Sequence, residues 1–170
     1  MTDLRYPVGP ETSDTPIAES LRILEAAPAR FRDAVRGLDD AQLDTPYRPG
    51  GWTVRQVIHH MPDSHMNAYC RCRMALTDDA PPVKSYDEKA WAELTDARTL
   101  PVAVSLGLFE GLHLRWVAMF RNLTSEQWKR AYVHSERGPT TLERTASLYA
   151  WHCRHHAAHI TSLRERMGWK

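Results

Sequence analysis

Four long stretches of this sequence repeat their apolar residues at the spacing of one face of an α-helix, and this pattern constrains the fold more than any other feature. The stretches cover residues 17–38, residues 53–76, the segment from Pro101 past Met119, and residues 140–168. No stretch alternates apolar and polar residues long enough to form a convincing strand. The pattern therefore predicts an all-α protein, most simply a four-helix bundle of up-down helices joined by long loops.

Capping boxes mark where several of these helices should begin. In a capping box, a Ser or Thr is followed three residues later by Glu or Gln, and the two side chains bind each other's backbone N–H groups. The pairs are Thr53 with Gln56, Ser85 with Glu88, Thr124 with Gln127, and Thr140 with Glu143. We expect a helix to start at each pair, short ones after Ser85 and Thr124 and long ones after the other two.

Two prolines lie inside predicted helices. Pro28 falls within the first helical stretch and Pro62 within the second. Proline lacks a backbone N–H and its ring clashes with the preceding turn, so Pro28 should kink or break the first helix and Pro62 should bend the second. Residues 132–139 are expected to form a loop or a short extended piece, and no sheet of consequence is expected.

Length and charge exclude several classes of function. The 170 residues suit one domain, residues 1–170, with a single core. Lys and Arg number 22 against 21 Asp and Glu, so the formal charge of +1 gives no field that would attract nucleic acid or an anionic membrane. The longest uninterrupted apolar run, residues 116–120, is far shorter than the roughly 20 residues that span a bilayer. We therefore expect neither nucleic acid nor membrane as a partner.

The chain start and the cysteines bear on the compartment. The first residues, from Met1 to Arg5, lack the apolar core of a secretory signal, so a cytoplasmic protein is expected. The three cysteines Cys70, Cys72 and Cys153 cannot all pair with one another, and in that compartment they should be reduced thiols. We place none of them in the candidate site.

Seven of the nine histidines fall in two short windows, and these windows carry the candidate chemistry. One window covers residues 59–65 of the second helix, and the other covers residues 151–159 of the last helix. Residues four apart lie on one face of a helix, so His155 and His159 can hold one ion. A third imidazole from the other helix would complete three protein ligands and leave a position open for water or substrate, as in catalytic zinc sites.

A second pair in the same window has the same spacing. His152 and His156 are also four residues apart, and a projection at about 100° per residue places His156 near the centre of the apolar face. The projection places His155, His159 and, on the second helix, His60 at the edge of the core face. An edge position lets a ligand meet both a neighbouring helix and solvent, so the projection mildly favours His60, His155 and His159. Its error is comparable to the difference between the two pairs, and both stay open.

Several sequence words resemble one known family. They are Tyr-Pro-Val-Gly at 6–9, Tyr-Arg-Pro-Gly-Gly-Trp-Thr-Val-Arg-Gln-Val at 47–57, His-His at 59–60, Asp-Ser-His-Met-Asn at 63–67, Tyr-Asp-Glu-Lys-Ala-Trp at 86–91, Tyr-Ala-Trp-His at 149–152, His-His at 155–156, Ala-His-Ile at 158–160 and Met-Gly-Trp at 167–169. The set spans nearly the whole chain. It resembles the DinB/YfiT-like metalloproteins, and among them the YfiT-type bacillithiol transferases.

The resemblance implies a fold, a metal and an activity. The fold is a four-helix bundle, usually a homodimer, with one divalent ion per subunit, zinc first and nickel second. Carried over by position, the ligands are His60, His155 and His159. The implied enzyme transfers a low-molecular-weight thiol, bacillithiol by resemblance, to an electrophilic or xenobiotic small molecule. The alternatives are a metal-dependent hydrolase that activates water and a non-catalytic metal-binding bundle.

Four further residues are candidates for supporting roles. Asp63 and His65 follow His60 closely, and either could orient a ligating imidazole through its second ring nitrogen. Equally, Asp63 could be a solvated helix residue and His65 a core residue. Arg55 and Arg154 could hold the carboxylates of an acidic thiol, although a solvated face explains each of them alone.

Overall fold

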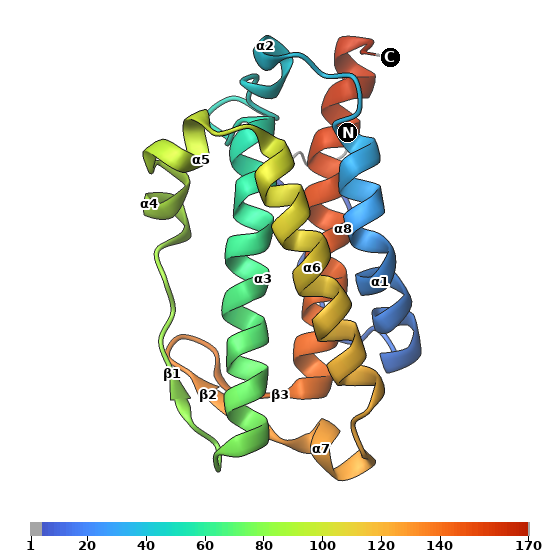
Figure 1. Cartoon of the computed structure of the whole chain (residues 1–170), viewed down its shortest axis with the longest axis vertical. Helices are drawn as coiled ribbons and strands as arrows, with labels where there is room; N and C mark the ends of the chain where they lie inside the picture. The colour runs from blue at the N-terminus through green and yellow to red at the C-terminus, as the bar shows by residue number, and fades with distance from the viewer. Residues whose placement is uncertain (1–4, 170) are drawn as a thin grey trace.

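Four long helices enclose one core (Figure 1). The computed structural model describes residues 5–169; the expectation about a secretory signal falls on Met1–Leu4 and so lies largely outside this range. The long helices are α1 (Ile17–Ala34), α3 (Val54–Thr77), α6 (Val102–Arg121) and α8 (Leu142–Met167). Both α1 and α3 pack against α6 and α8. The predicted all-α four-helix bundle is therefore confirmed.

The four long helices do not simply alternate in direction along the chain. α1 and α8 run one way along the bundle, whereas α3 and α6 both run the other way (Figure 1). Because consecutive long helices α3 and α6 are parallel, residues 78–101 must carry the chain back along the length of the bundle. This crossover contains β1 (Pro82–Val83), α4 (Glu88–Ala92) and α5 (Thr95–Thr99).

Two of the predicted capping boxes form as expected. Thr53 caps α3: its side chain accepts from the N–H of Gln56, and the Gln56 side chain accepts from the N–H of Thr53. Thr124 and Gln127 do the same for the short helix α7 (Ser125–Lys129). The last helix also ends where expected, because Gly168 adopts the left-handed conformation that terminates it.

The other two predicted caps were wrong by one or two residues. α4 is capped by Asp87 rather than Ser85, and α8 by Thr141 rather than Thr140. In both places the expected residue is already held by another backbone contact. The backbone N–H of Ser85 donates to Ser135 Oγ, and Thr140 pairs with Tyr132 in a strand.

Neither proline breaks its helix. Pro28 lies inside α1 and Pro62 lies inside α3, and both helices continue past them. The expected break at Pro28 is therefore not observed. α1 ends at Ala34, earlier than the apolar pattern to Leu38 suggested.

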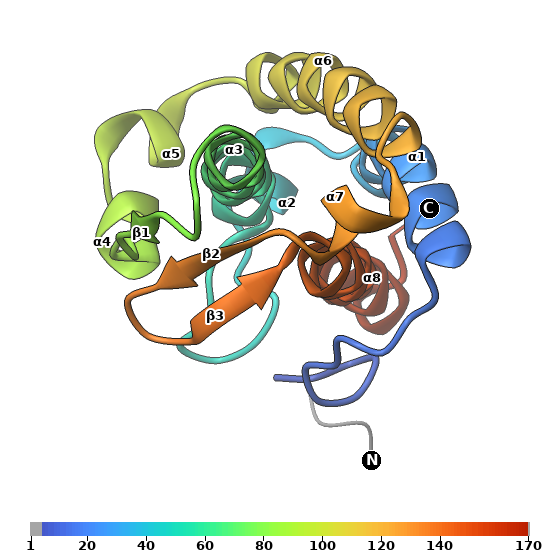
Figure 2. The same ribbon diagram turned by 90° about the horizontal axis from the view of Figure 1, so that it is seen from below.

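A small sheet was missed by the sequence patterns. β2 (Ala131–His134) pairs with β1 in parallel and with β3 (Gly138–Thr141) in antiparallel fashion. Strands of two to four residues are too short to show alternation. Figure 2 shows the sheet beside α3 and α8 at one end of the bundle.

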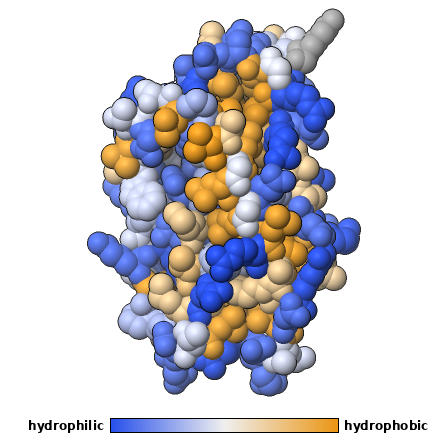
Figure 3. Space-filling model, in the orientation of Figure 1, coloured by the Kyte–Doolittle hydropathy of each residue, from blue (hydrophilic) through white to orange (hydrophobic). Residues whose placement is uncertain are grey.

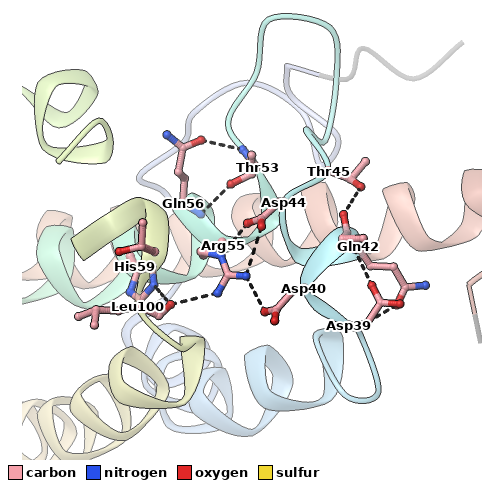
Figure 4. A network of polar contacts seen from close by, with 12 residues as sticks. Asp39, Asp40, Gln42, Asp44, Thr45, Thr53, Arg55, Gln56, His59 and Leu100 are labelled. Carbon is pink, nitrogen blue, oxygen red and sulfur yellow. Dashed lines mark hydrogen bonds and ion pairs between the residues drawn. The ribbon is translucent and has the colours of Figure 1, made fainter. Parts of the chain in front are cut away.

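At the other end, a buried arginine fixes the start of α3 (Figure 4). Arg55 Nε donates to Asp44 Oδ1 over 2.6 Å and its Nη2 donates to Asp40 Oδ1 over 2.8 Å, so α3 is tied to the short helix α2 (Asp40–Leu43). Its Nη1 also reaches the carbonyl of Leu100, to which His59 Nε2 donates over 3.1 Å. With all of these groups paired, Arg55 and His59 hold the first turns of α3 in place.

One helix resembles a membrane span in composition. By length and hydropathy alone α6 could cross a bilayer. Its inner side, however, buries Phe109, His113 and Trp116 in the bundle. α6 therefore packs on the bundle with one side, while its other side is exposed in this structure.

Candidate metal centre

Three imidazoles from two helices converge between α3 and α8. His60 comes from α3, and His152 and His156 come from adjacent turns of α8; one nitrogen of each ring lies within 4.8 Å of the other two. His60 Nε2 and His152 Nε2 are 3.3 Å apart. The His60 ring also lies 4.9 Å from that of His156. These three side chains form what we call the histidine triad.

The spacing of the triad suits a divalent ion. Nitrogen ligands at about 2.05 Å from a tetrahedral zinc ion are about 3.3–3.4 Å from each other, and the His60–His152 separation of 3.3 Å agrees with this. The Nδ1 atom of His156 is buried without a hydrogen-bond partner in residues 5–169. Imidazole nitrogens suit zinc, nickel, copper and iron, so the donor set fits a metal without selecting one.

His155 and His159, which the sequence favoured, lie in a different grouping. They approach His156, and the three form a second set of nitrogens within 4.8 Å of one another. Among the described residues, His60 belongs to no such set with His155 or His159. The structure thus brings His60 together with the rival pair, and the second ligand pair that we expect is His152 and His156.

Aromatic packing explains why the edge positions are turned away from His60. His155 stacks on Trp151, with ring centroids 4.4 Å apart and an angle of 15° between planes. His159 stacks on Tyr47, at 3.9 Å and 18°. Trp151 precedes His155 by four residues on α8, whereas Tyr47 comes from outside the helix. A projection of α8 alone therefore could not show the contact that holds His159.

The buried imidazoles near the triad are neutral. Burial lowers the pKa of His113 to about 4, and burial together with the charge of His155 lowers the pKa of His60 to about 4. Burial, followed by the neighbouring imidazoles, lowers the pKa of His65 and His152 well below 6.5. A neutral imidazole has one N–H donor and one lone pair, so the hydrogen bonds decide which nitrogen carries the proton.

A chain of hydrogen bonds sets these tautomers. The carbonyl of Leu24 can only accept, so His113 Nδ1 donates to it over 2.6 Å. His113 Nε2 must then accept from His65 Nδ1 over 2.9 Å, and His65 Nε2 must accept from His152 Nδ1 over 3.0 Å. His152 therefore presents the lone pair of its Nε2 to the triad, which is the form that binds a metal.

The triad opens into a cavity of about 830 Å³. The turn at residues 46–51 supplies one aromatic wall: Tyr47 N–H donates to the carbonyl of Trp52, and the Trp52 ring lies 4.8 Å from that of His60. Gly51 permits this turn, because a Cβ there would lie 2.8 Å from Arg48 Cγ and 3.2 Å from Tyr47 Cε1. The cavity is large enough for small organic molecules.

Comparison with known proteins shows the family of this chain. Residues 23–160 match the family model of the DinB superfamily. The chain belongs to the DinB superfamily.

Within the superfamily, the chain is similar to proteins of bacilli. It is 51% identical to a "Putative metal-dependent hydrolase" of Bacillus cereus (strain 03BB102), over 99% of this chain and 100% of that protein. It is 47% identical to YfiT of Bacillus subtilis, covering 98% of this chain and 99% of the solved chain, with a TM-score of 0.94. That structure is described as a probable metal-dependent hydrolase with an unusual four-helix bundle topology. The mycothiol-dependent maleylpyruvate isomerase, 17% identical with a TM-score of 0.62 over 84% of this chain and 61% of that chain, shares the fold.

Several other residues that the sequence suggested as candidates do not contact the histidine triad. Arg55 is fully engaged at the start of α3. Arg154 Nη2 reaches Thr15 Oγ1 over 3.4 Å and lines a different cavity. Burial raises the pKa of the Asp63 carboxyl to about 6, but in the described part of the chain this carboxylate hydrogen-bonds to no histidine.

Of Asp63 and His65, the two residues considered for orienting a ligating imidazole, only His65 contacts a histidine of the triad. His65 hydrogen-bonds to His152, as one of the two sequence interpretations allowed. His113, to which His65 also hydrogen-bonds, was not identified from the sequence. The available signal was a histidine on the apolar stripe of α6, four residues after Phe109 and three before Trp116.

The triad predicts which variants lose metal. We expect His152→Ala and His156→Ala each to lose the bound divalent ion, because each removes one of three ligands, whereas His155→Ala and His159→Ala should retain it. Metal content per chain, measured by mass spectrometry on untagged protein after dialysis, distinguishes the two pairs. Retention in His152→Ala with loss in His155→Ala and His159→Ala would instead support the ligands His60, His155 and His159.

The hydrogen-bond chain predicts an observable tautomer. In metal-free protein at pH 7.5, ¹⁵N NMR should show His152 protonated at Nδ1. His113→Leu breaks the chain and should weaken zinc binding by about 10–100-fold, the usual cost of losing a partner of a ligating histidine, as measured by competition with a chelator. His134→Leu is the control, because His134 takes no part in this series of hydrogen bonds. A His152 protonated at Nε2 would contradict the assignment.

Proposed function

We propose that this protein is a metal-dependent thiol S-transferase. It binds one divalent ion, zinc or nickel, through His60, His152 and His156, and it joins a low-molecular-weight thiol to an electrophilic small molecule. The observation that carries the proposal is that three neutral imidazoles lie together in the wall of a cavity of about 830 Å³. A structural or storage site would have no need of such a cavity beside its ligands.

The residues of the chain would divide the work as follows. A divalent ion at the triad would favour the ionised form of a thiol, or of water, at neutral pH. His65 and His113 orient His152, and Trp52 packs against His60, so the ligands are preorganised. Tyr47 and Trp52 cover one side of the cavity and exclude water, which leaves the electrophile to be positioned at the open side.

The lack of a carboxylate hydrogen-bonded to the triad favours a thiol over water as nucleophile; Glu88 and Glu136 line the same cavity but are exposed to solvent. Within residues 5–169, no carboxylate hydrogen-bonds to the ring of His60, His152 or His156. Hydrolysis by a metal-activated water usually relies on a nearby general base, whereas a thiolate needs none once it has ionised. The resemblance to YfiT-type proteins supports bacillithiol as the donor.

A metal-dependent hydrolase is the second candidate. It is favoured by the names given to the relatives of this chain in Bacillus cereus and Bacillus subtilis. The same triad and cavity would then serve an activated water and a cleavable substrate.

Thiol-dependent consumption of an electrophile separates the two functions. We expect the protein to conjugate monochlorobimane to a small thiol, with a rate that rises with pH and levels off above the pKa of the bound thiol. A chelator should abolish conjugation and zinc or a similar divalent ion should restore it. Conjugation that persists unchanged in metal-free protein or in His152→Ala/His156→Ala would exclude this mechanism, and ester hydrolysis without thiol would support the hydrolase.

The expected homodimer has a candidate surface. Figure 3 shows apolar residues over the face on which α6 lies, where Val104 is 58% and Leu108 is 50% exposed. We propose that a second copy of this chain covers that face. Leu108→Glu should convert a dimer to a monomer in analytical ultracentrifugation, whereas Leu114→Glu, about 120° around the helix, should not. A wild-type monomer at micromolar concentration would overturn this proposal.

A further inference from the structure

The cavity that contains the triad also reaches a buried positive charge. Arg71 of α3 is 7% exposed and lines the same cavity as His60 and His152. Its Nη2 donates to the carbonyl of Lys84 over 2.7 Å, which ties α3 to the segment after β1. Within residues 5–169, that carbonyl is its hydrogen-bond partner and no carboxylate pairs with its guanidinium.

This state is unusual for a buried arginine. Charged side chains in a protein interior are normally paired, because burying an unpaired charge is costly. A guanidinium presents five donors in a planar fork, and one carbonyl occupies only part of that capacity. Arg55, the other buried arginine among the described residues, shows the ordinary arrangement, with Asp44 at 2.6 Å and Asp40 at 2.8 Å.

The charges around Arg71 are already committed or solvated. Arg137 lines the same cavity, and its Nη2 donates to Glu11 Oε2 over 3.0 Å. Glu88 and Glu136 line the cavity too, but both are exposed residues in contact with solvent. Lys89 and Arg48 line the cavity as well, but Lys89 is exposed and Arg48 is only partly buried. Arg71 is therefore the buried cation that an anionic ligand would meet there without a carboxylate partner.

The position of Arg71 along α3 sets the length of such a ligand. Residues 60, 64 and 71 are separated by one turn and then two, so His60, Ser64 and Arg71 share one face of the helix. Eleven residues span about 16 Å of helix axis. Both side chains lean toward the N-terminus of α3, and the longer Arg71 side chain reaches farther back along that span. The gap between the guanidinium and the triad is therefore shorter than the span, and a ligand that contacts both must still be elongated.

The wall between the two ends is polar. Ser64 and Tyr149 both line the cavity there, and the Tyr149 hydroxyl donates to the Ser64 carbonyl over 3.3 Å. The hydroxyl of Tyr86, also in the cavity wall, is buried without a hydrogen-bond partner among the described residues. A ligand with amide or hydroxyl groups along its length could pair with it.

We propose that Arg71 is the carboxylate-binding end of the thiol site, so that the physiological thiol is an elongated molecule, of dipeptide to tripeptide size, with a carboxylate well separated from its sulfur. The proposal rests on the thiol transfer proposed above and names the class of thiol. Arg71 binds the carboxylate of the thiol through the free part of its guanidinium, while the sulfur of the thiol lies at the triad.

Binding of S-methylglutathione and of its diethyl ester tests the proposal without turnover. The methyl group removes the reactive thiol, and the ester removes the negative charges while keeping the length. By isothermal titration calorimetry, the wild-type protein should bind the acid about tenfold or more tightly than the ester, the usual effect of a hydrogen bond to a charged group. Arg71→Met should abolish this preference, Arg71→Lys should retain part of it, and Arg154→Met, which alters an arginine of another cavity, should leave it unchanged.

Conjugation kinetics then separate a ligand contact from a structural role. Arg71→Met should raise KM for glutathione but not for glutathione diethyl ester. Equal loss for the two thiols would mean that Arg71 only anchors the segment at Lys84, and it would overturn the proposal. So would a wild-type protein without preference for the acid, including one that binds neither compound at millimolar concentration. If instead the preference is present but no thiol is ever conjugated, the transferase function fails and the anion site remains.

Discussion

Burial of uncharged imidazole is the constraint on which this structure depends. A buried ring is neutral, and its N–H is stabilised where it meets an acceptor. In the series of hydrogen bonds from Leu24 through His113 and His65 to His152, each ring has such a partner, and the carbonyl of Leu24 fixes the direction of donation because it can only accept. The four members of this series come from α1, α6, α3 and α8, one from each long helix. The lone pair offered to a metal therefore depends on the correct packing of the whole bundle.

The fold was largely predictable because its long helices are amphipathic and carry local start signals. Thr53 with Gln56 and Thr124 with Gln127 act through side chains three residues apart, so the sequence alone contains the information. Thr140 failed as a cap because it is paired across the hairpin with Tyr132, a contact that no local pattern encodes. The direction of α6 was likewise beyond a local pattern, since it depends on the path of residues 78–101.

The sequence located the candidate site in two helix windows and selected His60, but it favoured His155 and His159 on α8, whereas the structure groups His60 with His152 and His156. The two pairs on α8 differ by a rotation of the helix face, and the stacking of His159 on Tyr47, a tertiary contact, is not visible in the sequence of α8. His113 was beyond reach for a related reason: its role depends on the carbonyl of Leu24, 89 residues away in the chain.

The crossover links the topology of the bundle to its chemistry. Parallel α3 and α6 oblige residues 78–101 to return along the outside of the bundle, and this return places Tyr86, Glu88 and Lys89 at the cavity. Arg71 holds the same segment through the carbonyl of Lys84. An alternating bundle with a short connection between those helices would leave the triad facing solvent, whereas here the connection supplies a wall. Changes in this segment would therefore alter which molecules reach the triad without altering the ligands, because the crossover and the histidines lie on separate elements.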